Sequence, residues 1–418
     1  MKNTATKINW KGMECIQLCA GGYTALIAPG IGSNVLRLHD DANGVEFFRW
    51  DENNTPEDIK QSAEVWGLPT LYLPNRFADG VLKTSDATYQ LPVNEAAPFH
   101  NHILIAPGIG SNVLRLHDDA NGVEFFRWDE NNTPEDIKQS AEVWGLPTLY
   151  LPNRFADGVL KTSDATYQLP VNEAAPFHNH IHGFLHKREH NVVAYSANEE
   201  GAWLRTSYVY NEEDPFFQYM PLRFTADFFF VLSEYGLEYK FSITNQSPKK
   251  LPVSVATHTT ISAPFVDGAR EEDIRLQVPV VEKWTLNERC LPTGEILPLN
   301  DYDKAYLNGT TCPVKRIVDN DMYTAGKLTY RGKPFRGVLM TDTASGKGIG
   351  YEVSDGYHFW ILWNDRGEKH YFCPEPMTAM IDAPNLDMPA EKTGFSELST
   401  GATFYLAQHF FTTLPEEA

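Results

Sequence analysis

Residues Tyr239–Thr244 read YKFSIT, in which large apolar side chains alternate with polar ones. Successive side chains of an extended chain point to opposite faces, so this pattern predicts a β-strand with one buried face. Similar period-two segments, separated by turn-forming clusters, are Trp203–Tyr210 (WLRTSYVY), Ile349–Val353 (IGYEV), Phe359–Trp363 (FWILW) and Thr403–Phe411 (TFYLAQHFF). Many short strands joined by polar turns predict an all-β fold, a large antiparallel β-sandwich.

Helical signals are sparse. The clearest is Thr133–Asp136 (TPED), where a capping threonine, a first-turn proline and two acidic residues predict one short helix that ends near Ala141. No Pro- or Ser-rich linker divides the chain. We therefore expect a single sandwich domain over residues 1–418, with few short helices.

Residues 26–103 and 104–181 have the same sequence at every position. Only two long copies are present, unlike the many shorter repeats of a solenoid, and their identity indicates either a recent natural duplication or an artificial one. Removing one copy of 78 residues from the 418 leaves 340. We expect 104–181 to occupy the working position, because this copy alone runs into His182 and the segments that follow. Residues 26–103 are then a surplus copy.

The amino-acid composition limits the kinds of partner that the protein can bind. The chain has 55 acidic and 35 basic residues and a formal net charge of −20, which argues against a nucleic-acid groove or an anionic membrane surface as partner. Its five cysteines are odd in number and form no CxxC pair, as is typical of reduced cytoplasmic thiols. The sequence has neither an N-terminal apolar signal segment nor a run of 18 apolar residues. We expect a cytoplasmic monomer or homodimer.

Four segments contain polar residues of the types used in catalysis: Trp144–Arg188, Leu251–Phe265, Pro292–Ile296 and Phe372–Asn385. In the second, a single histidine, His258, stands in an otherwise small and apolar strand. In the last, Glu375 lies between two prolines. A lone histidine on an apolar strand is more often a structural core residue, so position alone assigns no role to His258.

The first of these segments, Trp144–Arg188, has histidines at positions 178, 180 and 182 near its end. Alternate residues of a strand share a face, so these three could suggest a metal site, but no fourth ligand is in view. The sequence also lacks an HExxH motif, a P-loop and a GxGxxG after a strand. It predicts neither a metal nor a cofactor.

In order and spacing, these segments resemble the aldose 1-epimerase (galactose mutarotase) family over nearly all of the 340 residues. The family pattern has Asn-Arg after Gly-x-Pro, then Tyr-x-Leu-x-x-Asn, His-Gly, a histidine on a central strand, Pro-Thr-Gly-Glu, an aspartate near an aromatic residue, and Cys-x-Glu-Pro. Two positions depart from it: His-Gly-Gly is HGF at 182–184, and His-x-Tyr-Phe is HTTI at 258–261. These departures fit a divergent branch and leave the preferred sugar open.

The resemblance implies an isomerase that interconverts the anomers of free aldohexoses without a cofactor. Glu375 would be the base that takes the proton of the anomeric hydroxyl, and His258 the acid that protonates the ring oxygen. His182 would hold and polarise the ring-oxygen side. A carboxylate and an imidazole suit this reaction because their pKa values can be tuned toward neutrality.

The resemblance also implies a set of sugar-binding residues. Asn153 and Arg154 would contact sugar hydroxyls, and an aspartate of the segment VDNDMY at 318–323 would bind two more. Asp319 and Asp321 both fit that pattern, and its distance from Tyr323 favours Asp321.

Three other functions stay open. A hexose-6-phosphate epimerase of the same superfamily would need arginines around the C6 end of the sugar, and the motifs offer Arg154. A non-catalytic carbohydrate-binding protein would not need both Glu375 and His258. A glycoside hydrolase would need Asp321 and Glu375 about 5–9 Å apart across an open cleft.

Overall fold

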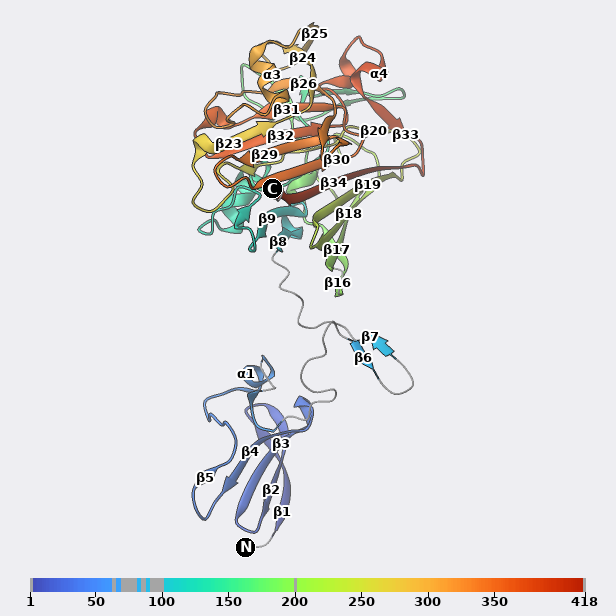
Figure 1. Ribbon diagram of the computed structural model, residues 1–418. Coiled ribbons are helices and arrows are strands. Elements are labelled where there is room, and N and C mark those ends of the chain that lie inside the picture. Colours follow the sequence, from blue (N-terminus) through green and yellow to red (C-terminus); the bar gives the residue numbers. More distant parts are fainter. Residues whose placement is uncertain are drawn as a thin grey trace. The chain divides into compact units, whose positions relative to one another are not determined.

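A computed structural model describes residues 3–61, 65–68, 81–83, 88–90, 101–198 and 201–415, with the backbone alone for 81–83 and 88–90. The chain forms two compact units, Met1–Val93 and Asn94–Ala418 (Figure 1). A single domain over residues 1–418 is the expectation from the sequence. The N-terminal strands instead pair with the first copy of the repeat, and each unit is described by itself.

The first unit contains a five-stranded antiparallel meander. Its strands are β1 (Thr4–Trp10), β2 (Met13–Ala20), β3 (Tyr23–Ala28), β4 (Asn34–Asp40) and β5 (Val45–Glu46), followed by the helix α1 (Pro56–Gln61). The strands β6 (Val81–Lys83) and β7 (Thr88–Gln90) pair antiparallel. The buried apolar residues of this unit form a small core: Cys15, Leu26, Ala28, Leu36 and Ile59.

The second unit is a sandwich of two antiparallel eight-stranded sheets. The back sheet has the order β16 (Asn191–Asn198), β17 (Gly201–Tyr210), β18 (Phe224–Ser233), β19 (Gly236–Asn245), β34 (Thr403–Thr413), β30 (Gly348–Val353), β29 (Gly337–Asp342) and β23 (Ile274–Gln277). The site sheet has the order β11 (Thr148–Leu149), β21 (Ala256–Thr257), β32 (Tyr371–Met377), β31 (Phe359–Trp363), β26 (Asp321–Ala325), β24 (Val280–Leu286) and β25 (Pro292–Leu297), with β22 (Ile261–Ser262) paired to β32.

Smaller elements complete the second unit. A three-stranded sheet has the order β10 (Val123–Glu124), β9 (Asn112–Asp118) and β8 (Asn101–Ala106). Four two-stranded pairs are β12 (Arg154–Ala156) with β15 (Asn179–Ile181), β13 (Val159–Lys161) with β14 (Thr166–Gln168), β20 (Leu251–Val253) with β33 (Ser396–Leu398), and β27 (Leu328–Tyr330) with β28 (Lys333–Phe335). The described α-helices of this unit are short: α2 (Pro134–Gln139), α3 (Asp301–Leu307) and α4 (Ala390–Thr393).

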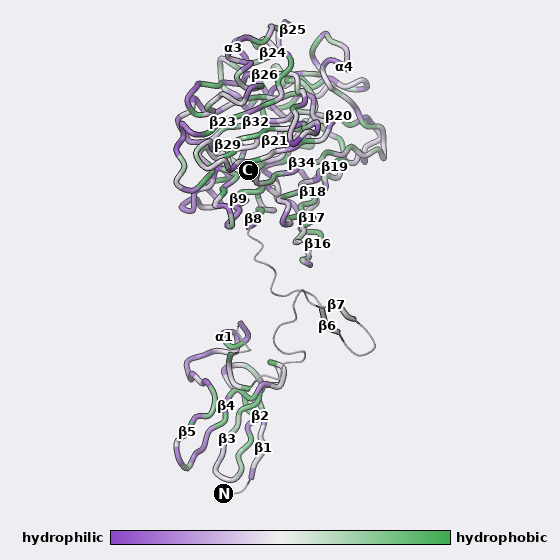
Figure 2. The backbone as a smooth tube through the Cα atoms, in the orientation of Figure 1, coloured by the Kyte–Doolittle hydropathy of each residue, from purple (hydrophilic) through white to green (hydrophobic). Residues whose placement is uncertain are grey.

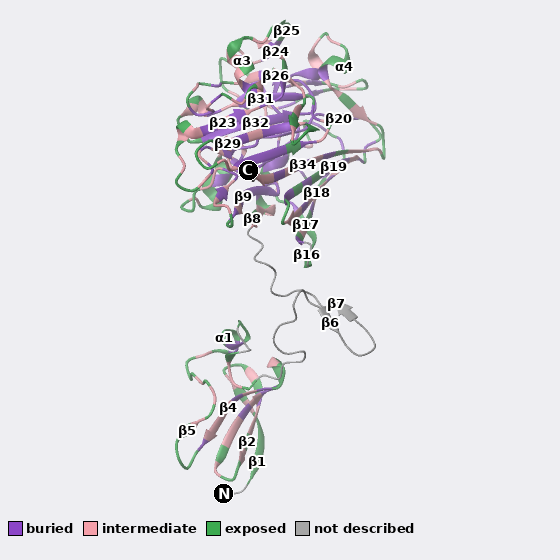
Figure 3. Cartoon of the chain, in the orientation of Figure 1, coloured by how far each residue is buried: buried purple, intermediate pink, exposed green. Residues whose placement is uncertain are grey.

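The core of the second unit lies between its two large sheets. The back sheet contributes residues such as Phe228 and Phe241, and the site sheet contributes Tyr323 and Trp360. Apolar and buried residues are concentrated along these strands (Figures 2 and 3). The antiparallel sandwich predicted from the period-two alternation is confirmed.

The helix predicted from the TPED segment is present as α2. The side chain of Thr133 accepts a hydrogen bond from the backbone N–H of Asp136, whose carboxylate accepts one from the backbone of Thr133 in return. The helix ends at Gln139, and a separate 3₁₀ turn covers Ala141–Val143. The described helices all lack the length and the apolar composition that a membrane-spanning helix requires.

Candidate active site

Strand register brings His258 and Glu375 together. Pairing of Ala256 with Met377 and of Ile261 with Phe372 sets the register of this segment against β32 and places His258 opposite Glu375. His258 Nε2 lies 3.4 Å from Glu375 Oε1. Both residues are buried, with 4% and 2% of their surfaces exposed. Two groups capable of acid–base chemistry thus face each other across neighbouring segments of the site sheet.

Burial controls the protonation of this pair. Burial raises the pKa of Glu375 to about 8, although the positive charge of Arg154 opposes part of that rise. Burial lowers the pKa of His258 to about 4. Near neutral pH the pair therefore holds one proton, on the carboxyl group, and the imidazole is neutral.

His182 stands beside this pair. Its ring is perpendicular to that of His258, with 5.5 Å between the centroids. Its backbone has a left-handed φ of 65° and donates a hydrogen bond to the carbonyl oxygen of Asn153 at 2.9 Å. The next residue, Gly183, also has a positive φ, and a Cβ there would lie 2.2 Å from the carbonyl oxygen of Tyr150. Glycine at position 183 is therefore needed for this close approach of two backbone segments.

Arg154 is held on β12 by polar partners. Its Nε and Nη2 atoms lie 2.9 and 2.8 Å from Oε1 of Glu173. Its Nη1 donates to Oδ1 of Asn153 and to Oδ1 of Asn320, each at 3.3 Å. The positive charge of Arg154 opposes part of the rise that burial causes in the pKa of Glu375.

Asp321, the aspartate that the sequence favoured, is not brought to this cluster. Its Oδ1 lies 3.2 Å from Nζ of Lys283. Along β26 the side chain of Asp321 shares a face with Tyr323, which belongs to the core between the sheets. Glu375 shares the opposite face with Met377, which packs in a separate cluster. The neighbouring Asn320 contacts Arg154 instead, and its Nδ2 donates to Oδ1 of Asp319 at 2.9 Å.

The three histidines of the sequence motif have separate partners. His178 Nδ1 lies 3.0 Å from Oδ1 of Asp157, and His180 Nδ1 lies 2.7 Å from the carbonyl oxygen of Pro170. His182 faces His258. Within the described part of the chain, no three His, Cys, Asp or Glu side chains form a group that could hold a metal ion.

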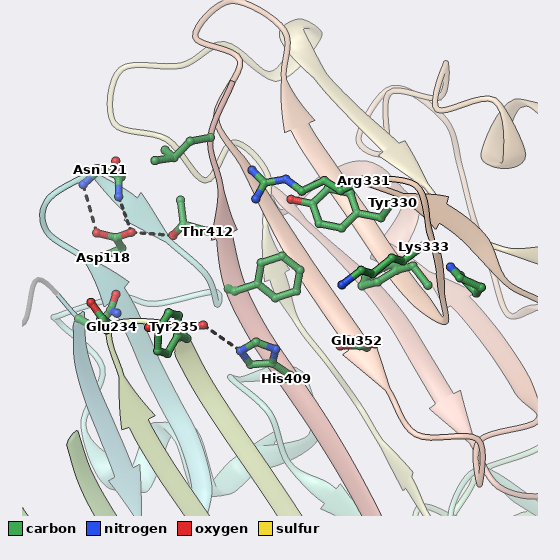
Figure 4. A pocket seen from close by; sticks show the side chains of 16 residues that line it. Asp118, Asn121, Glu234, Tyr235, Tyr330, Arg331, Lys333, Glu352, His409 and Thr412 are labelled. Carbon is green, nitrogen blue, oxygen red and sulfur yellow. Dashed lines mark hydrogen bonds between the residues drawn. The ribbon is translucent and has the colours of Figure 1, made fainter. Parts of the chain in front are cut away.

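A separate cavity of about 570 Å³ adjoins the back sheet (Figure 4). Its lining includes Tyr330, Lys333, Glu352 and His409, and at one end Asp118 accepts hydrogen bonds from Asn121 and Thr412. None of the six predicted site residues lines this cavity. The candidate active site is therefore the His258–Glu375 cluster.

Known proteins with a similar sequence or structure support the sandwich fold described above. A family model described as aldose 1-epimerase matches residues 104–409. The chain belongs to the aldose 1-epimerase family. The match begins at Leu104, the first residue of the second copy, and spans all six predicted site residues of this family member.

Solved structures related to this aldose 1-epimerase family member share its architecture. A galactose mutarotase-like protein from Clostridium acetobutylicum matches with a TM-score of 0.72 and 24% identity over 99% of both chains. A galactose 1-epimerase from Lactobacillus acidophilus NCFM matches with a TM-score of 0.54 and 14% identity, over 99% of this chain and 98% of that one. At these identities the likeness concerns the fold alone.

Two curated relatives match a smaller part of the chain. The plasmid and chromosomal LacX proteins of Lactococcus lactis subsp. lactis are each 22% identical over 206 residues. That region is 48% of this chain and 63% of each LacX protein. This aldose 1-epimerase family member therefore matches less than two thirds of the length of these relatives.

Three residues of the site were missed from the sequence of this aldose 1-epimerase family member. Glu173 and Asn320 contact Arg154, and the Trp363 ring lies 5.6 Å from that of His258. Trp363 could have been found, because it pairs with Cys373 and alternates with Ile361 on the face that carries Glu375. Glu173 and Asn320 lie outside regular strands, so no periodicity marks them.

Proposed function

We propose that this member of the aldose 1-epimerase family interconverts the α and β anomers of free aldohexoses by acid–base ring opening and reclosure. The observation that carries the proposal is the 3.4 Å contact between His258 and Glu375, two buried groups whose side chains can each give or take a proton. Anomer interconversion needs one proton removed from the hydroxyl on C1 and one delivered to the ring oxygen. A one-proton pair can do both.

The proton balance closes over one cycle. The reacting form of the pair carries its proton on His258, so that Glu375 is a carboxylate base and His258 an imidazolium acid, and sugar binding has to offset the opposite preference of the free pair. Glu375 then takes the proton of the C1 hydroxyl while His258 gives its proton to the ring oxygen, and the C1–ring oxygen bond breaks. After rotation about C1–C2, attack on the other face of the aldehyde re-forms that bond. The two proton transfers reverse, so no group is consumed.

The remaining residues orient the sugar. His182, whose Nδ1 is buried without a hydrogen-bond partner in the described structure, is free to contact the ring-oxygen side. Arg154, fixed by Glu173 and Asn320, binds hydroxyl groups away from C1. Such positioning contributes to rate because the reacting atoms are held at the acid and the base.

A glycoside hydrolase is less consistent with the site. That reaction needs two carboxyl groups facing one another across the sugar. Asp321 is paired with Lys283 and lies on the opposite face of the site sheet from Glu375. A sugar-binding role without catalysis would not explain why a glutamate and a histidine are buried in contact.

The test is polarimetry on freshly dissolved α-D-glucose and α-D-galactose, with the spontaneous rate subtracted. Glu375→Gln and His258→Ala should each lower kcat by about 10²–10⁴-fold, because each removes a proton-transfer group. Glu130→Gln, at an exposed position, is the matched control and should retain full activity. Near-normal turnover by a folded Glu375→Gln protein would overturn the proposal.

A further inference from the structure

The second unit has a strand edge that is open to a further strand. β8 pairs with β9 on one side, and none of the described strands pairs with its other side. We call that side the open edge of β8. Such an edge presents a row of unpaired backbone N–H and C=O groups. Of its apolar side chains, Leu104 is 44% exposed and Ala106 is partly exposed.

The first unit shows what can cover this edge. Its strand β3 ends with Leu26–Ala28, the same three residues that end β8 at Leu104–Ala106. In the first unit the corresponding edge of β3 is covered by β2, with Ile16 opposite Ile27, and β1 pairs with β2 in turn. Leu26 and Ala28 are buried there. The hairpin of β1 and β2 is therefore the occupant that the repeat itself identifies.

The apolar cluster beneath this edge is present in both units. In the first unit it contains Leu36 and Ile59 together with Cys15 of β2. In the second unit it contains the equivalent residues Leu114 and Ile137, but no residue of β1 or β2. Further residues of the hairpin pack against the first cluster: Ile8, Trp10 and Met13. The second cluster is thus the first one without its cover.

β8 also offers the hairpin an apolar contact that β3 lacks. Ile16 and Leu18 lie on the face of β2 opposite to Cys15, outside the described core of the first unit, and Leu18 is 38% exposed. In the register of the β2–β3 pairing they would lie opposite Ile105 and Ile103 of β8. Those two isoleucines pack against the main core of the second unit. On β8 the hairpin would therefore have both of its faces covered.

We propose that the β1–β2 hairpin exchanges, within one chain, between the edge of β3 and the open edge of β8. Movement to β8 breaks the pairing with β3 and leaves residues 21–100 as the connection between the hairpin and its new partner strand. The entropy cost of closing a loop grows only slowly with loop length. Attachment also gives the hairpin an effective concentration of about 1 mM, above that of a second copy at about 1 μM. The inference does not depend on the proposed function.

The turn between β2 and β3 controls the balance between the two sites. It consists of Gly21 and Gly22, with φ values of 60° and 87°. Positive φ at both central residues is the requirement of a tight hairpin turn that glycine meets without strain. This turn is needed only while β2 pairs with β3. Gly22→Val strains it and should move the hairpin toward β8.

Cys19 of β2 makes the two states measurable. Its Sγ lies 3.5 Å from Oγ1 of Thr24 on β3, and the position equivalent to Thr24 on β8 is His102. In a Cys290→Ser/Cys312→Ser background, Thr24→Cys and His102→Cys each place a thiol opposite Cys19 in one of the two states. The measurement is the rate of disulfide formation with a mild oxidant, read by non-reducing electrophoresis and peptide mass spectrometry.

Glu391→Cys is the control for random collision, because Glu391 is exposed on α4, which lies away from β8 (Figure 1). We expect His102→Cys to form its disulfide within single chains at least about tenfold faster than this control, because pairing aligns the two thiols. Gly22→Val should raise the ratio of the rate at position 102 to that at position 24 by about fivefold or more.

Two results would overturn the proposal. The first is a rate at position 102 that equals the collision rate, with and without Gly22→Val. The second is a disulfide at position 102 that joins two chains, because the hairpin would then come from a second copy.

Hydrogen exchange gives a second readout that needs no added thiol. The segments Tyr23–Ala28 and Asn101–Ala106 differ in sequence, so mass spectrometry distinguishes them although the rest of the repeat is identical. Gly22→Val should slow amide exchange in Asn101–Ala106 and speed it in Tyr23–Ala28, because protection follows strand pairing. Circular dichroism is the folding control. Unchanged exchange in Asn101–Ala106 of the folded variant would contradict the exchange of the hairpin.

Discussion

The contact between His258 and Glu375 determines how the site responds to pH. Burial raises the pKa of Glu375 to about 8 and lowers that of His258 to about 4, so the pair holds one proton between these values. Interacting groups titrate as a unit, and both limits belong to the pair. We expect kcat/KM to follow a bell, falling below about pH 4, where a second proton is added, and above about pH 8, where the shared one is lost. Polarimetry across this range is the measurement, and a flat profile would contradict the pairing.

The same burial predicts a pH-dependent stability. Because the pKa of Glu375 is raised in the folded state, the folded protein keeps a proton that the unfolded chain releases above about pH 4.5. Stability should therefore fall between about pH 4.5 and 8, by about 1.4 kcal/mol per pH unit from this group. Glu375→Gln removes that contribution. The test is the difference in free energy of unfolding between wild type and Glu375→Gln, measured by urea titration at about pH 5 and again at about pH 8. This difference should be smaller at pH 8 than at pH 5. A constant difference would mean that Glu375 is ionised throughout.

At the scale of elements, the sequence predicted which segments form strands better than it predicted which face of a strand carries the site. Strand register brings His258 and Glu375 together, because both residues lie on strands or directly beside them. That register is set by the pairing of whole strands. β26 shows the limit. Asp321, Met322 and Tyr323 alternate, but Met322 and Tyr323 are both buried, on opposite faces of the sheet. When both faces are apolar, alternation cannot say which one carries the site, and the choice of Asp321 over Asp319 rested on its distance from Tyr323 alone.

The pairing of β12 with β15 predicts which of two identical arginines acts. Arg154 pairs with Ile181, the residue before His182, and this pairing exists for the second copy. Its counterpart Arg76 lies outside the described residues. Arg154→Ala should lower kcat/KM for glucose by about 10²-fold, because it removes charge-assisted contacts to the sugar, whereas Arg76→Ala should be nearly silent. Polarimetry on both variants tests this, and the reverse ranking would mean that the first copy serves the site.

At the scale of the whole molecule, identical sequences have different environments. Leu26 and Leu104 occupy equivalent positions of the repeat, yet Leu26 is 6% exposed and Leu104 is 44% exposed. In the first unit Leu26 packs in a core that includes Cys15 of β2, while β8 is an edge strand of its sheet. The reverse holds for Phe47, which is 52% exposed, and Phe125, which is 2% exposed. Sequence alone could not predict this, because burial depends on what each copy packs against.

That asymmetry argues for deleting residues 26–103. The deletion joins Ala25 to Leu104 and restores the sequence Ala-Leu-Ile-Ala at the junction. The register that pairs Ile16 with Ile27 would then pair Ile16 with Ile105, so β2 would cover the exposed edge of β8. Unpaired edges promote aggregation, so the 340-residue product should be more soluble than the full chain and at least as active per mole. Sedimentation and polarimetry measure the two properties, and an unfolded product would show that both copies are structural.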